Sequence, residues 1–420
     1  MDTLVERCAG IDIGKADVKV CIRVPGKRAG THRKEVRTFA TMTGSLLELR
    51  QWLIDERISL VGMESTGDYW RPVYYLLEEV VECWLVNPQH IKAVPGRKSD
   101  VSDAAWIAQL VEYGLVRPSF VPPPPIRQLR DLTRYRASLI HDRTRQVQRL
   151  HNVLEDAGIK LSLVATDILG VSGRAMIGAL IDGERDPHRL ADMALGKLRK
   201  KNAALIEALT GRFGDHHATL CQMMLEQIEH IDTAIRRLDT AIDTAIEPYR
   251  QIQQRLITIP GVAKRASEVI IAETGGDMSR FATPGHLSSW AGLCPGNNES
   301  AGKHRSGRTR SGNAWLCGML GDCATAAARS KNTYLAERHR RIQRRRGRKR
   351  AKVAISRSIL ESCWWVVKHD VDYQDLGPEH FITRTPNPAR RAHRIITELR
   401  VLGYDVQVGP MVAARAAQPA

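Results

Sequence analysis

The chain has 420 residues, which is long enough for two or three domains. Hydrophobic residues make up 43% of it, yet no apolar run approaches the roughly 20 residues that a membrane span requires, so a membrane-spanning protein is excluded and a soluble one is expected. Lys and Arg number 63 against 46 Asp and Glu, a formal net charge of +17, so we expect a polyanionic partner, with nucleic acid favoured over an anionic membrane surface.

Two further features indicate a cytoplasmic protein. The N-terminus lacks the basic-then-apolar order of a signal peptide, and the eight cysteines form no C-x-x-C pair. A reducing compartment therefore fits, and neither a zinc knuckle nor a disulfide framework is expected. With its basic balance, the protein is expected to associate with nucleic acid in that compartment.

Residues 1–117 are predicted to form an α/β domain. A hairpin is predicted at residues 8–24, because an apolar run precedes a Gly-Lys-Ala-Asp turn and an alternating second strand. After it, a helix, a strand, a second helix and a short strand alternate at residues 46–55, 58–63, 74–79 and 84–86. Such alternation favours a sheet covered by helices.

The proline-rich residues 118–125 are expected to form a stiff spacer between domains, and residues 126–255 are predicted to be helical. Residues 126–158 are a basic helical stretch. An apolar stripe with alternating three- and four-residue steps follows, made of Ile228, Ile231, Ile235, Leu238 and Ile242. The stripe suits either a coiled-coil seam in a dimerising arm or a buried helix of a bundle.

Residues 256–375 are predicted to form a mainly α-helical domain. In residues 256–273, Pro260 and Gly261 separate two apolar stretches, which suits either a helix-hairpin-helix that holds a phosphate or Ala-rich helix packing. Residues 292–313 are polar and are expected to form a loop that faces a ligand. The cations of this loop are Lys303, Arg305, Arg308 and Arg310.

A basic run occupies residues 338–352, where ten of fifteen positions are Lys or Arg. A solvated helix face is one explanation, but nucleic-acid contact is favoured because no acidic residue interrupts the run. Its candidate contacts are Arg344, Arg345, Arg346, Arg348, Lys349 and Arg350. The run leads into an apolar helix at 353–367. Residues 376–420 are an extension without an assigned role, in which 391–408 are predicted to form one helix and one strand.

Two carboxylates fall on the predicted strands. Asp12 lies between Ile11 and Ile13, so its side chain is expected on the opposite face of the sheet from theirs. A lone carboxylate buried there is costly without a cation. Glu64 ends the apolar strand and precedes a turn, at the edge where α/β sheets place their chemistry.

Two more carboxylates, Asp100 and Asp103, lie three residues apart near the start of a predicted helix, so they share one face. Taken alone, the pair is explained by acidic capping of the helix N-terminus. Together with Asp12 and Glu64 it favours metal binding. Four hard oxygen donors suit Mg²⁺ or Mn²⁺, which would activate a nucleophile and stabilise the leaving oxygen of a phosphodiester.

Ser300 lies in the basic loop, between Pro295-Gly296 and Gly302-Lys303. Most loop serines are solvated turn residues. A serine that attacks phosphorus needs cations for the developing charge, and Lys303, Arg305, Arg308 and a metal would supply them. No order of His, Asp and Ser suggests a protease triad.

The order of the carboxylates resembles that of the RNase H-like fold of RuvC-type resolvases. The motifs Gly-Ile-Asp-Ile-Gly-Lys, Glu-Ser-Thr-Gly, Lys-Ser-Asp-Val-Ser-Asp-Ala, Ile-Pro-Gly-Val and Ser-Ala-Gly-Lys follow one another at residues 10–15, 64–67, 98–104, 259–262 and 300–303. In this order they resemble the DEDD transposases of insertion sequences, that is, the Piv-type recombinases that include the bridge-RNA recombinases. The resemblance covers most of residues 8–375.

This resemblance implies a RuvC-like domain whose metal site is Asp12, Glu64, Asp100 and Asp103, with Mg²⁺ or Mn²⁺ as cofactor. It further implies a transposase domain with Ser300 as nucleophile, a coiled-coil region between the two, and a covalent phosphoseryl-DNA intermediate. The implied partners are donor and target double-stranded DNA, a noncoding guide RNA, and further copies of the chain in a dimer or tetramer, with a site shared between subunits.

Two other functions remain open at this point. One is a metal-dependent junction nuclease that cuts by water attack and leaves Ser300 structural. The other is a non-catalytic nucleic-acid binding protein whose carboxylates only cap and brace helices. A binder gains nothing from four carboxylates beside a polyanion, because their repulsion is relieved chiefly by cations between them.

Overall fold

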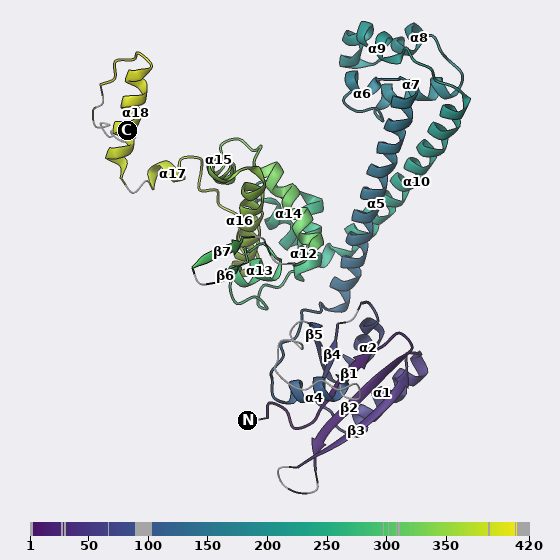
Figure 1. Cartoon of the computed structure of the whole chain (residues 1–420), viewed down its shortest axis with the longest axis vertical. Coiled ribbons are helices and arrows are strands. Elements are labelled where there is room, and N and C mark those ends of the chain that lie inside the picture. The colour runs from purple at the N-terminus through teal and green to yellow at the C-terminus, as the bar shows by residue number, and fades with distance from the viewer. Residues whose placement is uncertain are drawn as a thin grey trace, which may run out of the picture. The chain divides into compact units, whose positions relative to one another are not determined.

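The computed structural model describes residues 3–26, 28, 31–65, 67–88, 103–296, 298–300, 302–307, 309, 311–384, 387–407 and 409, with the backbone alone described at 298–300 and 303–306 (Figure 1). The chain divides into two units, Met1–Pro122 and Pro123–Ala420. The division falls within the proline-rich segment.

The first unit is built on a five-stranded sheet of order β3-β2-β1-β4-β5. Strands β1 (Cys8–Ile13), β2 (Asp17–Pro25) and β3 (His32–Ala40) form an antiparallel meander. Strand β4 (Leu60–Glu64) pairs parallel to β1, and β5 (Glu82–Val86) pairs parallel to β4. This mixed sheet, together with the helices that cover it, confirms the predicted RuvC-like fold class.

Helices cover both faces of this sheet. On one face, the odd-numbered residues of β1 join a core with α1 (Thr43–Asp55) and α2 (Trp70–Leu77). On the other, Cys8 and Leu60 pack with residues of α4 (Asp103–Glu112). Because side chains alternate along a strand, the even-numbered Asp12 and Glu64 belong to the α4 face.

The second unit begins with a long helical arm. Helices α5 (Pro124–Asp156) and α10 (Asp215–Ala245) run antiparallel, since Arg136 contacts Asp239 while Arg143 contacts Asp232. Four short helices close the far end around their own core: α6 (Leu161–Val164), α7 (Val171–Ile181), α8 (Pro187–Asp192) and α9 (Asn202–Leu209) (Figure 1). The apolar stripe of α10 is buried or half-buried within this unit, where Ile231 and Ile235 pack on Leu139 of α5.

The proline run requires a correction. Pro124 and Pro125 do not precede the arm helix as a spacer but form its first turn. A proline is tolerated there, because the first N–H groups of a helix have no intrahelical partner. Pro118 bridges to Val86, and Val121 packs on the core of the first unit.

A mainly α-helical bundle with one buried core follows the arm. It contains α11 (Arg250–Ile257), α12 (Lys264–Thr274), α13 (Pro284–Trp290), α14 (Ala314–Ala327), α15 (Tyr334–Arg346) and α16 (Arg348–His369). The predicted Pro-Gly turn joins α11 to α12. A Cβ on Gly261 would lie 2.3 Å from the Cys323 carbonyl, and α12 is buried from Ala266 to Thr274. Close helix packing therefore accounts for the glycine in this turn.

The described part of the C-terminal extension contains a one-turn helix, α17 (His380–Thr383), and a longer one, α18 (Pro388–Val401). The strand predicted before residue 408 is wrong: the described residues 402–407 form no strand, and none of the described strands pairs with them. None of the helices in the described part of the chain is long and apolar enough to cross a membrane.

Candidate functional site

Glu64 ends β4, and Asp12 is the last residue but one of β1, the parallel strand beside it. The register pairs Gly10 with Gly62 and Ile11 with Met63, so the next residue on each strand is the carboxylate. Both side chains are half-buried. The predicted arrangement of one carboxylate inside the first strand and one at the end of a later strand is therefore present at one sheet edge.

Helix α4 brings a third carboxylate to this face. A Cβ on Gly10 would lie 2.2 Å from both the carbonyl oxygen of Ala104 and the amide of Ala108, and a Cβ on Gly62 would lie 2.4 Å from Val111. Only glycine lets the helix backbone approach the sheet so closely. Asp103 is the first residue of α4 and directly precedes Ala104, so it lies over the strand that carries Asp12.

The fourth carboxylate, Asp100, lies outside the described residues, so its position relative to the other three is an expectation. Among the described residues, one group of three possible metal ligands has all its donor atoms within 4.8 Å of one another. It is not the carboxylates of the sheet but Asp156, His216 and His217. The three carboxylates on the sheet are thus more widely spaced than that. Like charges repel at short range unless a cation lies between them.

The cluster of Asp156, His216 and His217 is better explained as a helix cap. The Gly214 N–H donates to Nδ1 of His217 at 3.1 Å, so a neutral imidazole carries its hydrogen on Nε2, which lies 3.1 Å from Asp156 Oδ2. The lone pair that a metal would need is therefore already occupied by the backbone. His217 joins the start of α10 to the end of α5.

Ser300 lies in a hairpin, where the sequence predicted a loop. Strands β6 (Asn298–Ser300) and β7 (Lys303–Ser306) pair antiparallel, with Ser300 opposite Lys303. Gly302 lies in the turn and adopts a positive φ of 74°. A two-residue hairpin turn favours glycine at such a position, and the Ala-Gly sequence was the signal available for it. Ser300 is therefore the last residue of its strand.

Cysteine thiols in the same bundle do not compete as nucleophiles. Burial raises the pKa of Cys317 above its usual range and raises that of Cys323 to about 12. Both thiols therefore stay protonated at neutral pH, and only a thiolate attacks efficiently.

Sequence reasoning missed a buried carboxylate, Glu273, which holds the end of the basic loop at residues 292–313. Glu273 of α12 is fully buried and forms a bidentate pair with Arg134 of α5, at 2.7 and 2.8 Å. Its Oε2 also accepts from Asn313 Nδ2 at 2.6 Å, and Asn313 caps α14. Arg130 donates to the Glu273 carbonyl at 2.8 Å. This network ties the arm to the segment that ends the hairpin region.

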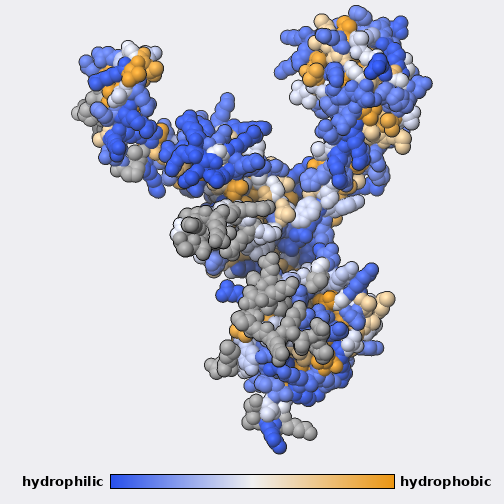
Figure 2. Space-filling model, in the orientation of Figure 1, coloured by the Kyte–Doolittle hydropathy of each residue, from blue (hydrophilic) through white to orange (hydrophobic). Residues whose placement is uncertain are grey.

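The predicted cations are distributed over two regions. Lys303 and Arg305 lie on β7, while Arg308 and Arg310 fall outside the described residues. Six more side chains are exposed at the end of α15 and the start of α16, namely Arg344, Arg345, Arg346, Arg348, Lys349 and Arg350. Figure 2 shows a strongly hydrophilic surface over α15. An exposed surface with this density of positive charge is suited to binding a polyanion.

Family comparisons agree with this arrangement. A transposase family model, DEDD transposase of the IS110 type, matches residues 9–159, which contain the described carboxylates. A second model, the transposase IS116/IS110/IS902 family, matches residues 253–341, which contain the hairpin. Together the two segments span more than half of the chain.

Two individual relatives agree with the family models, and one solved structure is similar over part of the chain. The insertion element IS900 uncharacterized 42 kDa protein of Mycobacterium paratuberculosis is 26% identical over 66% of this chain and 73% of its own length. Protein y4pF/y4sB of Sinorhizobium fredii (strain NBRC 101917 / NGR234), assigned as a transposase, is 25% identical over 75% of this chain and 74% of its own. The Thermus thermophilus RuvC structure aligns over 27% of this chain and 99% of its own, at 16% identity and a TM-score of 0.21. This chain therefore belongs to the IS110 family of DEDD insertion-sequence transposases, enzymes that act on DNA.

Proposed function

We propose that this transposase cuts and rejoins DNA by attack of the Ser300 hydroxyl on phosphorus, close to a divalent cation held by Asp12, Glu64, Asp100 and Asp103. The observation that supports it best is the close seating of α4 on Gly10 and Gly62, which gathers three of these carboxylates on one sheet face. Ser300 lies in the second family-matched segment, next to basic residues.

The donor set fits the proposed cofactor. Carboxylate oxygens are the ligands that Mg²⁺ and Mn²⁺ prefer, and DEDD enzymes of the RuvC-like type typically use divalent metals. Such a cation would stabilise the negative charge that develops on the phosphoryl oxygens and the leaving oxygen. The carboxylates contribute by fixing its position at the strand ends.

The chemical step conserves the ester bond. The Oγ–P bond of Ser300 forms as one P–O ester bond of the DNA breaks, and the hydroxyl proton of the serine ends on the leaving oxygen. A DNA hydroxyl then attacks the phosphoserine in the reverse sense, which restores Ser300 and joins the new strands. Since one phosphoester replaces another at each step, no external energy source is required. Lys303 and Arg305 would stabilise the anionic phosphorus centre.

The proposed partners are donor and target double-stranded DNA, a noncoding guide RNA, and further copies of the chain in a dimer or tetramer. The net charge of +17 is compatible with both nucleic acids. We expect recombination between two DNA sites to require the transcript of the noncoding DNA beside the gene. Equal recombination in the presence and absence of that transcript would contradict the RNA part of the proposal.

Trapping of the covalent intermediate tests the mechanism. Ser300→Ala is expected to abolish the covalent protein–DNA adduct seen on denaturing gels, while DNA binding is kept. Ser306→Ala is the matched control, because Ser306 lies on the other strand of the same hairpin, and it should form the adduct at wild-type yield. Asp12→Asn should abolish the adduct as well.

The same experiment separates the other two functions. If Ser300→Ala still cuts DNA while Asp12→Asn does not, the protein is a junction nuclease that uses water. If neither wild-type protein nor variant breaks DNA with Mg²⁺ or Mn²⁺, the chain only binds nucleic acid. Either result would overturn the proposal.

A further inference from the structure

The C-terminal extension is charged and adds no residues to the hydrophobic core through α18. Helix α18 contributes no buried residue, and its exposed apolar side chains include Val401, which is 82% exposed. Both α17 and α18 lie beyond the last residue that the family models match, which is 341. Core packing does not explain a helix that buries no residue, so we expect its role to lie on its surface.

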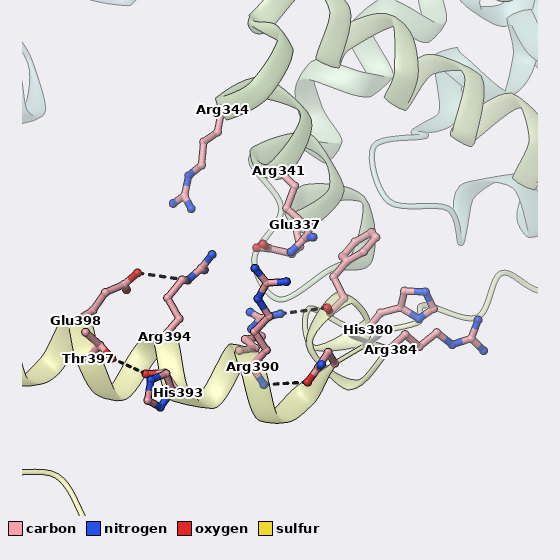
Figure 3. A pocket seen from close by; sticks show the side chains of 13 residues that line it. Glu337, Arg341, Arg344, His380, Arg384, Arg390, His393, Arg394, Thr397 and Glu398 are labelled. Atoms are coloured by element: carbon pink, nitrogen blue, oxygen red, sulfur yellow. Dashed lines mark hydrogen bonds and ion pairs between the residues drawn. The ribbon is translucent and has the colours of Figure 1, made fainter.

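An open groove of about 1040 Å³ runs between α15 on one side and α17 and α18 on the other (Figure 3). Six arginines line it, five from α15 and α18 and one, Arg384, directly after α17: Arg341, Arg344, Arg384, Arg390, Arg391 and Arg394. Figure 3 shows Arg344 extending from α15 toward the space above α18, and Arg394 rising from α18. Arginines thus come from both walls.

Protein carboxylates do not neutralise this groove. Two glutamates line it, and Glu398 pairs with Arg394 at 3.4 Å, while Glu337 pairs with Arg340, which is not a lining residue. Within the described part of the chain, Arg344, Arg384 and Arg390 make no ion pair with a carboxylate. Like charges facing one another across a groove repel, and a polyanion between them removes that cost.

The groove suits phosphate contact rather than base stacking. Proteins that hold single strands offer open aromatic faces on which bases stack. The described lining residues include one phenylalanine, Phe381, and no tyrosine or tryptophan. His380 and His393 also line the groove, and His380 lies edge-on to Phe381 at 5.3 Å. Tyr334 stacks on Phe381 at 5.1 Å with an interplanar angle of 17°, and the Arg341 guanidinium lies 4.9 Å from its ring centre. The Phe381 ring is therefore already in contact with protein groups, and the contact with Arg341 holds that guanidinium in place.

We propose that this groove binds the phosphate backbone of duplex DNA outside the reacting phosphodiester. Arginine is well suited to this, because its planar fork makes paired hydrogen bonds to phosphate. Arg390 and Arg394, four residues apart on α18, present cations on successive turns of one face. The groove would thus be an additional DNA-binding element of the transposase. This proposal can be wrong even if the Ser300 mechanism is right.

The test compares two double variants of the full-length chain that each remove two positive charges. Arg384→Gln with Arg390→Gln alters the groove, whereas Arg189→Gln with Arg400→Gln alters arginines that do not line it. The probe is a duplex DNA of about 30 base pairs, with affinity measured from low to moderate salt. At about 0.15 M salt we expect the groove variant to bind at least about 10-fold more weakly, and its salt slope to fall by about 2.

The control pair should lose less than about 2-fold in affinity. Equal losses in both variants would show that net charge alone matters and would overturn the proposal. So would a loss confined to a single strand or an RNA duplex of the same sequence. Thermal unfolding should be unchanged, because α18 buries no residue. At saturating DNA the yield of covalent adduct should match wild type, which separates this proposal from that for Ser300.

Discussion

At the scale of single residues, two glycines decide whether the carboxylates gather. Gly10 sits where a Cβ would lie 2.2 Å from the backbone of α4, so Gly10→Ala must push the helix away and shift Asp103 with it. We expect a loss of about 1–3 kcal/mol in the free energy of unfolding, measured in urea. Stabilisation of the protein by added Mn²⁺ should be lost as well.

The control for this prediction is Gly44→Ala on α1. Nothing lies within 4 Å of a Cβ at Gly44, and alanine is the better helix former. This variant should be neutral or gain up to about 1 kcal/mol. If Gly10→Ala behaved like Gly44→Ala, the close seating of α4 would not be what positions Asp103.

The turn beside Ser300 supports a second prediction at this scale. Gly302 has a positive φ and open space around it, so a side chain there meets no clash but costs about 1–2 kcal/mol in backbone energy. We expect the yield of covalent adduct to fall in the order wild type, Gly302→Asn, Gly302→Val, because asparagine tolerates this conformation better than valine. Gly307→Ala, at a negative φ with equally open space, should keep the adduct. A yield that Gly302→Val leaves unchanged would show that the turn does not position Ser300.

At the scale of elements, the sequence predicts what local patterns encode and misses what distant partners impose. The first hairpin, the short parallel strands and the long arm helix are all found near their predicted positions, since each has its own periodicity. Strand β3 was missed, because its exposed, charged residues show no apolar alternation and become a strand only by pairing with β2 over nine positions. The strand predicted after α18 fails for the opposite reason, since it has no described partner.

The candidate functional site was likewise predictable only where local sequence features mark its residues. Asp12, Glu64 and Asp103 could be selected from residue type and position, because strand ends and helix starts are local features. The buried Glu273 could not be, since its partners Arg134 and Asn313 lie 139 and 40 residues away in the chain. A glutamate within an apolar helix was its only signal.

That network yields a prediction for the arm and the bundle. Glu273→Gln removes the negative charge that balances two arginines, so we expect a loss of about 2–3 kcal/mol in the free energy of unfolding. Adduct yield should fall too, because Asn313 loses a strong acceptor. The comparison is Glu247→Gln, which breaks a 2.6 Å pair with Arg250 but lies 68% exposed, and it should cost less than about 1 kcal/mol. Similar losses in urea for both variants would mean that the buried network does not tie the arm to the bundle.

At the scale of the whole molecule, the proposed reaction divides its groups between two units that fold around separate cores. The carboxylates belong to Met1–Pro122 and Ser300 to Pro123–Ala420. Such a division permits the serine of one subunit to act with the carboxylates of another, as symmetric oligomers allow. The arm stripe that would suit a dimer seam is covered within its own chain, so subunit contact has to involve other surfaces.

Mixing two inactive variants distinguishes a shared site from one within a single chain. Ser300→Ala and Asp12→Asn are each expected to form no adduct alone. In a dimer that combines one of each, one site has both lesions and the other has an intact serine with intact carboxylates. At equal mixing about half of the dimers are of this kind, so about a quarter of the wild-type adduct should return. Adduct should form on the Asp12→Asn chain, which a mass tag on one variant would reveal. If the mixture stays inactive after subunit exchange is demonstrated, each chain must complete its own site, and the hairpin would then have to meet the carboxylates of the same polypeptide.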